Sequence, residues 1–347
     1  MPIPTEPIGS IPRPPELVEA MASGADLESR FDDAVRDTIA RFEATGSPVI
    51  TDGEQAKPSF VTYPLHGLEN LAADGLTIPF EDGHTRQLPR LTAGPFRYAT
   101  YADGYLRRAK EYAHLPVKQA VIAPSALSLI YPEGGIDGYP REQFLADLAD
   151  EAEADIRRSL DAGAHSVQLD FTEGRLSLKL DPSGGVLREL VRINNSVLER
   201  FSDDERRRIG VHTCPGGDRD ATHSAQVDYA ELLPTLFTLK AGNFYLQLAS
   251  EQDRPRVLRI VKEHAPAEAT TFVGVIDPID PRVETAEEVR DRVLEAAEVL
   301  GVEQLGTCDD CGFSPFGDDT STSRDTAFAK IRARVEGTKL AAEALGL

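Results

Sequence analysis

The sequence IGVHTC at residues 209–214 is a short apolar run that ends in a histidine and a cysteine. Successive side chains of a strand point to opposite faces, so His212 and Cys214 share one face. The run HSVQLD at 165–170 has the same form and ends in Asp170. Short apolar runs that end in polar residues are typical of buried parallel strands that deliver side chains to a site at one edge of the sheet.

Runs of this kind recur along the chain and alternate with helical patterns. We predict strands at 48–52, 117–123, 165–170, 209–214, 243–248, 271–277 and 303–308, after an opening strand that runs into residues 8–10. Helical patterns lie at 15–45, 141–162, 187–201, 229–239, 254–264, 286–300 and 326–345. Eight strands that alternate with helices predict an α/β fold, the (β/α)8 TIM barrel. The alternative is an open doubly wound sheet, but no GxGxxG motif follows the first strand, which disfavours its dinucleotide-binding version.

Residues 56–105 interrupt this alternation and are rich in proline, glycine and aromatic residues. We interpret them as an insertion with a hairpin beside the barrel mouth, in the N-terminal third of the chain. No internal repeat and no low-complexity linker divides the sequence, so we expect residues 1–347 to form a single barrel domain.

Charge and cysteine content limit the partners and the compartment. The 347 residues carry a formal net charge of −21, and such a surface repels nucleic acid and anionic membranes. No apolar run approaches the roughly 18 residues of a membrane span. Three cysteines, without a secretion signal in MPIPTEPIGS, favour a reducing compartment, so we expect a cytoplasmic protein. The oligomeric state stays open, a homo-oligomer included.

The ends of the predicted strands carry polar and metal-binding side chains, and in a (β/α)8 barrel the active site lies at these ends. Buried polar groups cost free energy unless they are paired, so a purely structural core would not require them. The strand ends supply Ser10, Asp52, Glu54, Ser125, Asp170, His212, Cys214, Gln247, Asp277, Cys308 and Cys311.

One imidazole and two thiolates, from His212, Cys214 and Cys311, form a donor set for Zn²⁺. The simpler interpretation is two buried structural cysteines and a capping histidine. Cys308 forms a CxxC motif with Cys311 and would close a Cys3His site, but we favour Cys308 as a packed neighbour. Three protein ligands beside an open position are typical of catalytic zinc, which holds a thiol as thiolate for attack on an electrophilic carbon.

At these motifs the chain resembles the catalytic domain of the cobalamin-independent methionine synthase family, within the methionine synthase and uroporphyrinogen decarboxylase-like superfamily. The motifs follow one another in the family's order: IGSIPRP at 8–14, DGE at 52–54, VQLD at 167–170, HTC at 212–214, GVIDP at 274–278 and DDCG at 309–312. The resemblance implies a (β/α)8 barrel with zinc at its mouth and a methyltransferase of methionine biosynthesis. It also implies zinc binding by His212, Cys214 and Cys311, and binding of the amino-acid part of homocysteine by Ser10, Glu54 and Asp170.

The chain departs from the family at three places. Gln247 stands where the family has a glutamate as fourth zinc ligand, and Glu251, Cys308 or water are the alternatives. The synthases carry a histidine after the strand that ends in GVIDP, whereas this chain offers Asp277 and Asp280 as candidate catalytic residues. They also stack a pterin on a tryptophan, whereas this chain has none and Tyr131 is the nearest aromatic candidate for substrate binding.

We therefore expect a zinc-dependent thiol methyl- or alkyltransferase that acts on a small homocysteine-like thiol and an alkyl donor. Methyltetrahydrofolate polyglutamate is not the expected donor, because the chain lacks the tryptophan and the second barrel of the long synthases. One alternative is an enzyme for another small thiol, similar to the epoxyalkane–coenzyme M transferases. A metal-free, decarboxylase-like barrel is the other. A sulfonate-bearing thiol would require a cationic group, for which the candidates are Arg13, Lys57, Arg175 and Arg219. The loop at 215–224 also carries His223, which could reach the substrate.

Overall fold

Six parallel strands form the centre of the computed structural model, which describes residues 3–23 and 27–347. Their order in the sheet is β10–β9–β8–β7–β6–β5, so strands that follow one another in sequence lie side by side. Nearly every residue of these strands is buried, as expected for a parallel sheet covered on both faces. The bounds are β5 Gln119–Ile122, β6 Val167–Asp170, β7 Ile209–Thr213, β8 Asn243–Leu246, β9 Thr270–Ile276 and β10 Leu305–Asp309.

Two further chain segments close the sheet into a barrel. Thr5 forms a parallel bridge with Thr307 of β10, and Ile50 forms a parallel bridge with Val117, just before β5. The two segments meet each other where the backbone N–H of Ile11 donates to the carbonyl of Gly53 at 3.0 Å. The predicted (β/α)8 TIM barrel is confirmed, with two of its eight strands reduced to single bridges and the first pairing at Thr5 rather than at 8–10.

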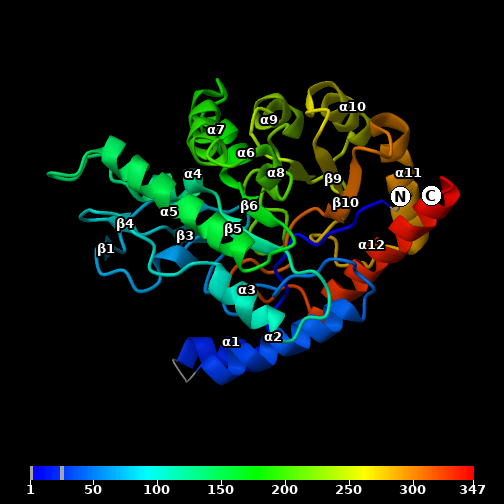
Figure 1. The fold of residues 1–347 in the computed structure, drawn as a ribbon, viewed down its shortest axis with the longest axis horizontal. Helices are drawn as coiled ribbons and strands as arrows, with labels where there is room; N and C mark the ends of the chain where they lie inside the picture. Colours follow the sequence, from blue (N-terminus) through cyan, green and yellow to red (C-terminus); the bar gives the residue numbers. More distant parts are fainter. Residues whose placement is uncertain (1–2, 24–26) are drawn as a thin grey trace.

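Long helices surround the strands, which lie at the centre of Figure 1. The predicted helix at 15–45 is two helices, and its residues 24–26 lie outside the described part of the chain. Four helices absent from the sequence prediction are α3 Asp103–Lys110, α4 Pro124–Leu127, α6 Glu173–Leu180 and α8 Asp203–Arg206. The other helices are α1 Pro15–Ser23, α2 Glu28–Glu43, α5 Arg141–Asp161, α7 Gly185–Leu198, α9 Tyr229–Leu236, α10 Arg254–His264, α11 Ala286–Leu300 and α12 Arg324–Ala344, with 3-10 turns at Tyr63–Leu65 and Ser128–Ile130.

The predicted hairpin is present in the insertion at 56–105. Strand β2 (Thr77–Pro79) pairs antiparallel with β3 (Thr85–Gln87), and β1 (Leu71–Ala72) pairs with β4 (Arg90–Leu91) outside them. The backbone N–H of Glu81, just after β2, donates to the carbonyl of Thr222 in the loop that follows β7. The hairpin therefore docks over the carboxyl end of the barrel strands and contributes to the wall of the site.

Within the described residues, no helix has both the length and the apolar character that crossing a membrane requires.

Candidate active site

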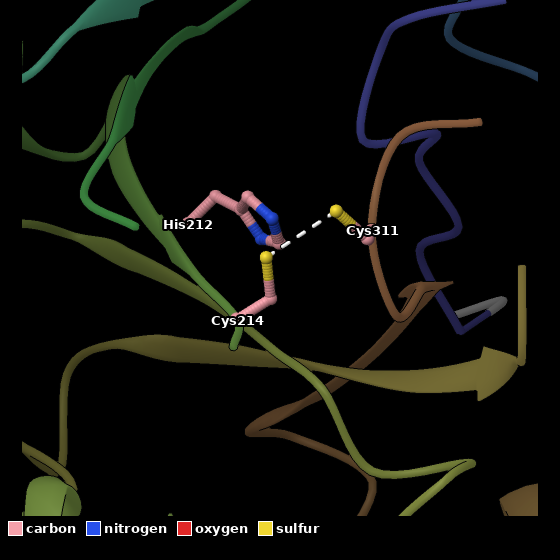
Figure 2. A group of neighbouring side chains, drawn as sticks. All are labelled: His212, Cys214 and Cys311. Atoms are coloured by element: carbon pink, nitrogen blue, oxygen red, sulfur yellow. Dashed lines mark hydrogen bonds between the residues drawn. The ribbon is translucent and has the colours of Figure 1, made fainter. Parts of the chain in front are cut away.

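Three buried side chains converge at the carboxyl end of the barrel. His212 lies in β7, Cys214 follows that strand, and Cys311 lies two residues beyond β10. One potential ligand atom from each lies within 4.8 Å of those of the other two. Figure 2 shows the three side chains pointing toward one another, with the sulfur atoms of Cys214 and Cys311 3.3 Å apart. Both cysteines are free, so the predicted ligand set is assembled as reduced thiols.

The His212 ring has one occupied nitrogen and one that is unused. Nδ1 lies 3.3 Å from the carbonyl oxygen of Tyr245, which accepts its proton, while Nε2 is buried without a hydrogen-bond partner. This tautomer offers the Nε2 lone pair to a metal, and an outer hydrogen bond of this kind orients most metal-binding histidines. A hydrogen bond from the Cys311 thiol also lowers the pKa of Cys214. The cluster therefore fits a metal ion that prefers nitrogen and sulfur ligands.

Gln247, one residue beyond β8, brings an unused oxygen to this cluster. Its Nε2 donates to Oε1 of Glu251 at 2.8 Å, whereas its own Oε1 is buried without a partner. A Cβ atom added at Gly217 would lie 3.4 Å from this oxygen and 3.2 Å from the Cβ of Cys311. The Gln247 oxygen and the two cysteines thus approach the same glycine backbone, and a larger residue at 217 would crowd them.

The loop that carries Gln247 is held by Asp310. Its carboxylate accepts hydrogen bonds from the backbone N–H groups of residues 248, 249 and 250, each at 2.8 Å. Burial raises the pKa of Asp310 to about 7. Sequence reasoning missed this positioning residue, although it directly precedes Cys311 in the DDCG motif.

Cys308 is not part of the cluster. Its thiol donates to the carbonyl of Phe272 at 3.4 Å, and it packs with Ile8, Tyr245 and Phe272 in a separate apolar group. The bulge between Cys308 and Asp309 at the end of β10 changes the register there. Its place as a packed neighbour agrees with the interpretation favoured from the sequence and leaves the closed Cys3His alternative without geometric support.

A cavity opens beside the cluster and extends under the hairpin. Ser10, Glu54 and Asp170, the residues predicted to hold the substrate, line it together with the three metal-binding candidates. The backbone of Glu54 has φ of 56°, a conformation that non-glycine residues seldom adopt and that occurs most often at functional sites. The wall of this one cavity thus contains both the residues predicted to bind the substrate and the residues predicted to bind the metal.

The Glu54 carboxylate and its loop are fixed by two buried cations. Lys57 donates from Nζ to Oε1 of Glu54 at 2.9 Å, and the carboxylate charge raises the pKa of Lys57. Arg13 donates to the carbonyls of Glu54 at 2.7 Å, Lys57 at 2.6 Å and Phe316 at 2.8 Å. Arg13 therefore ties the loop after the second barrel segment to the loop that follows Cys311.

Asp170 and Glu173 place two more carboxyl groups at the cavity. Gln168 donates to Asp170 at 2.7 Å, and burial together with the charge of Glu54 raises the pKa of Asp170 to about 7. Burial also raises the pKa of Glu173, in the first turn of α6, to about 7. Sequence reasoning missed Glu173 because it considered strand ends alone, whereas this residue begins the helix that follows β6.

Three predicted residues lie away from the cavity. Asp277 lines a separate hollow with Arg175 and Glu251, and the carboxylate of Asp280 accepts the backbone N–H of Arg282. Tyr131 stacks on Phe144 with ring centroids 5.1 Å apart, and its hydroxyl donates to the carbonyl of Tyr139. Asp277, Asp280 and Tyr131 thus do not line the cavity beside the cluster, although Gln247 lines the same hollow as Asp277.

The barrel carries, at the carboxyl ends of its strands, a His–Cys–Cys cluster that is typical of a zinc site, and together they define the class of enzyme. The chain belongs to the family described as cobalamin-independent synthase, catalytic domain, which matches residues 3–338. This membership confirms the resemblance seen in the sequence motifs and the assignment as a methyltransferase-type enzyme of the methionine synthase family.

Individual relatives extend over the full chain. A methionine synthase of Saccharolobus solfataricus is 25% identical over 356 residues, which cover 99% of this chain and 96% of that protein. A methionine synthase of Sulfurisphaera tokodaii is 24% identical over 353 residues, covering 99% and 94%. The structure of a B12-independent methionine synthase from a Shewanella species, in complex with selenomethionine, superimposes with a TM-score of 0.78 at 20% identity over 100% of both chains. That structure shows the same fold.

Proposed function

We propose that this enzyme transfers a methyl or alkyl group to a small thiol, with homocysteine as the leading acceptor, at a zinc ion held by His212, Cys214 and Cys311. The observation that carries the proposal is the convergence of three buried donor atoms, one of them the unused Nε2 of His212, on the wall of the cavity. Bound zinc would hold the substrate sulfur as a thiolate near neutral pH. The chain's own residues then orient that sulfur toward the alkyl donor.

Gln247 is our candidate for the fourth position. Its Oε1 has no other partner and lies beside Gly217 and the two cysteines. Glu251 is the weaker candidate, because its Oε1 already accepts hydrogen bonds from Arg175 and Gln247, both at 2.8 Å. An amide oxygen is a neutral and weak ligand for zinc. An incoming thiolate can therefore displace it without removing a negatively charged ligand from the metal.

The amino-acid part of the acceptor fits the acidic wall. Asp170 and Glu54 are the groups that would bind an α-ammonium group, and Ser10 offers a hydroxyl beside them. An ammonium group next to Asp170 would lower the raised pKa of that carboxyl and hold it ionised. The site would therefore bind a zwitterionic thiol more tightly than an uncharged thiol of the same length.

A sulfonate-bearing thiol fits this wall less well. The cationic candidates are engaged elsewhere: Lys57 with Glu54, Arg13 with backbone carbonyls, and Arg175 with Glu251. Arg219 is exposed and donates to the carbonyl of Ser321. The same shortage of free cations disfavours a decarboxylase-like enzyme, whose substrates carry several carboxylates. The structure therefore favours an amino-acid thiol.

The last proposals concern the compartment, the domain organisation and the oligomeric state of the enzyme. Two thiols 3.3 Å apart must stay reduced to bind a metal, so we place the enzyme in a reducing compartment, the cytoplasm. We also propose that residues 1–347 act as one barrel domain, with the insertion serving as part of its site. The cluster and the cavity are built from a single chain, so the site requires no partner subunit. The proposal therefore holds for a monomer and for a homo-oligomer alike.

A titration of the zinc-loaded protein with different thiols tests which thiol is the acceptor. Homocysteine should release about one proton to solvent when it binds, because coordination favours the thiolate. 1-Butanethiol, which lacks the ammonium group, and 2-mercaptoethanesulfonate, which replaces the amino acid with a sulfonate, should bind at least tenfold more weakly. Cys308→Ser is the matched control, since it removes a thiol outside the cluster. Tighter binding of the sulfonate, or proton release that persists without zinc, would contradict the proposal.

A further inference from the structure

Apart from the histidines and the metal-binding cysteines, the ionisable side chains of the described cavity wall are all carboxyl groups. Four carboxyl residues line it, Glu54, Asp170, Glu173 and Asp218, and within residues 3–23 and 27–347 no lysine or arginine does so. Lys57 compensates Glu54 from behind, but Asp170, Glu173 and Asp218 have no salt-bridge partner in the described part of the chain. A low-dielectric cavity of this kind favours a cationic occupant and disfavours an anionic one.

Three aromatic rings line the same cavity. Phe60, Phe80 and Phe316 line it, with ring centroids 5.4 Å apart for Phe60 and Phe316 and 6.5 Å apart for Phe80 and Phe316. Arg86 stacks on Phe316 at 3.8 Å and is paired with Asp319. Arg86 does not line the cavity, and its charge is paired with Asp318 as well as with Asp319. Aromatic rings beside carboxylates are the usual surroundings of bound quaternary ammonium and related cations.

Glu173 and Asp218 are wall carboxyl groups that each have a buried oxygen without a hydrogen-bond partner. Ser125 donates its hydroxyl to Oε1 of Glu173, whereas Oε2 is buried and has no hydrogen-bond partner. The side chain as a whole is 8% exposed and lines the cavity together with the three phenylalanines. An unpartnered buried carboxylate oxygen is costly, and a cation in the cavity would remove that cost.

The imidazole of the cavity wall is not a proton donor for a departing amine. His223 is the histidine of the described wall outside the metal cluster, and burial lowers its pKa to about 4, so its ring is neutral near pH 7. Asp277 and Asp280, the candidates from the sequence, lie outside the cavity. A neutral methylamine donor would need protonation before it could leave, and Glu173, whose pKa burial raises to about 7, would have to supply that proton. A donor that already carries a positive charge needs no proton.

We propose that the alkyl donor is a compact onium cation, a sulfonium or quaternary ammonium compound, held between Glu173 and the rings of Phe60, Phe80 and Phe316. The proposal rests on the thiol alkylation proposed above and names the class of its second substrate. The thiolate sulfur forms a bond to the methyl carbon as the bond from that carbon to the onium sulfur or nitrogen breaks. The electron pair of the broken bond stays on the leaving atom, which departs as a neutral thioether or tertiary amine. No proton is needed, and the thiol proton has already left to solvent.

A donor panel tests this on the zinc-loaded enzyme with homocysteine as acceptor. S-methylmethionine and glycine betaine represent the sulfonium and ammonium branches, with methyltetrahydrofolate triglutamate and methylcobalamin as competing donors. Transfer of an isotopically labelled methyl group from either onium compound supports the proposal and identifies the branch. Tetramethylammonium should compete with that donor, whereas uncharged tert-butanol of similar size should not.

Variants locate the subsite. Glu173→Gln and Phe316→Leu should each raise the KM for the onium donor by roughly tenfold, the scale of one buried cation contact, and leave the KM for homocysteine unchanged. Glu142→Gln, an exposed first-turn glutamate of α5, is the matched control and should change neither. Because Glu173 could instead serve as an acid, a fall in kcat at constant donor KM in Glu173→Gln would overturn the proposal.

Different results would contradict the donor assignment and the proposed function. Turnover with the folate or with methylcobalamin but with neither onium compound would overturn the donor assignment and leave the thiol alkyltransferase intact. Absence of homocysteine binding and of proton release would contradict the proposed function itself. Binding of tetramethylammonium can be measured by calorimetry without any turnover, so the subsite has a readout independent of activity. No heat of binding for any of the cations would count against it.

Discussion

Lys57 and Glu54 form an ion pair with 2.9 Å between Nζ and Oε1, and their side chains are only 1% and 4% exposed. A buried pair of this kind stabilises the fold little by itself, but loss of one partner leaves an uncompensated charge in the interior. Nζ of Lys57 also donates to the carbonyl of Ala120 in β5, so the pair connects the Glu54 loop to the barrel. The pair thereby fixes the position of a carboxylate at the cavity wall.

We expect Lys57→Met to lower the free energy of unfolding by about 3–5 kcal/mol, because it leaves the Glu54 carboxylate buried and unpaired. The double variant Lys57→Met with Glu54→Gln should recover at least half of that loss, since neither charge then remains. Equilibrium denaturation of the four proteins of this cycle gives the coupling energy. Equal instability of the single and double variants would show that Lys57 acts through packing alone.

Cys311→Ser should lose zinc, because it removes one of three donor atoms that lie within 4.8 Å of one another. The loss of affinity should exceed the roughly 10–100-fold typical of an outer-shell change. Metal content after dialysis against a graded chelator measures it. Cys308→Ser should retain its zinc, since Cys308 donates to the carbonyl of Phe272 outside the cluster. Full retention in the Cys311 variant would contradict the ligand assignment.

Gln247→Glu should tighten zinc binding, because a carboxylate adds negative charge at the fourth position. The same change replaces the hydrogen bond to Glu251 with a contact between two carboxylates at the present 2.8 Å separation. Gln247→Glu combined with Glu251→Gln should therefore bind zinc more tightly than the single variant. Competition with a fluorescent chelator gives both affinities. If neither variant exceeds the natural protein, another group holds the fourth position.

Glu173→Gln should make the protein more stable at pH 8 and leave it nearly unchanged at pH 4. Burial raises the pKa of Glu173 from 4.5 to about 7, so the folded state holds more protons than the unfolded state between these values. The stability of the natural protein then falls as pH rises through that window, by at most roughly 3 kcal/mol from this group.

The glutamine variant removes this dependence. Denaturation midpoints at pH 4, 6 and 8 measure the difference, with Glu142→Gln as a control that should show none. A constant difference across the three pH values would mean that Glu173 does not titrate in this range. Higher stability together with a weaker donor subsite in Glu173→Gln would indicate that the site is maintained at the expense of stability.

Residues close in sequence explain why most of the fold could be predicted. The strand runs at 165–170, 209–214 and 243–248 contain β6, β7 and β8, since burial on both faces of a parallel strand requires a continuous apolar run. The second strand, predicted at 48–52, contains the bridge at Ile50, but the first strand was harder to locate. Its bridge lies at Thr5 rather than at 8–10, and such a single contact has no local signature.

The site could be predicted in part for the same reason. His212 and Cys214 share a face through the two-residue period of a strand, and no tertiary information is needed to place them together. Distances between residues on different strands cannot be predicted in this way, because they depend on how the barrel closes and on loop conformation. The tertiary structure decided between the two interpretations of Cys308, and it alone placed Asp277 and Asp280 outside the cavity and Glu173 at its wall.

The sequence by itself determined the alternation of strands and helices, the acidic charge, and the histidine and cysteines at strand ends, because these follow from local periodicity and composition. Only the tertiary structure decided which of those side chains meet. Lys57 turned out to neutralise Glu54 rather than to face the substrate, and the hairpin brought Phe80 to the wall beside Phe316. The physical reason is that burial and pairing are set by contacts between segments distant in the chain, and those contacts exist only once the barrel has closed.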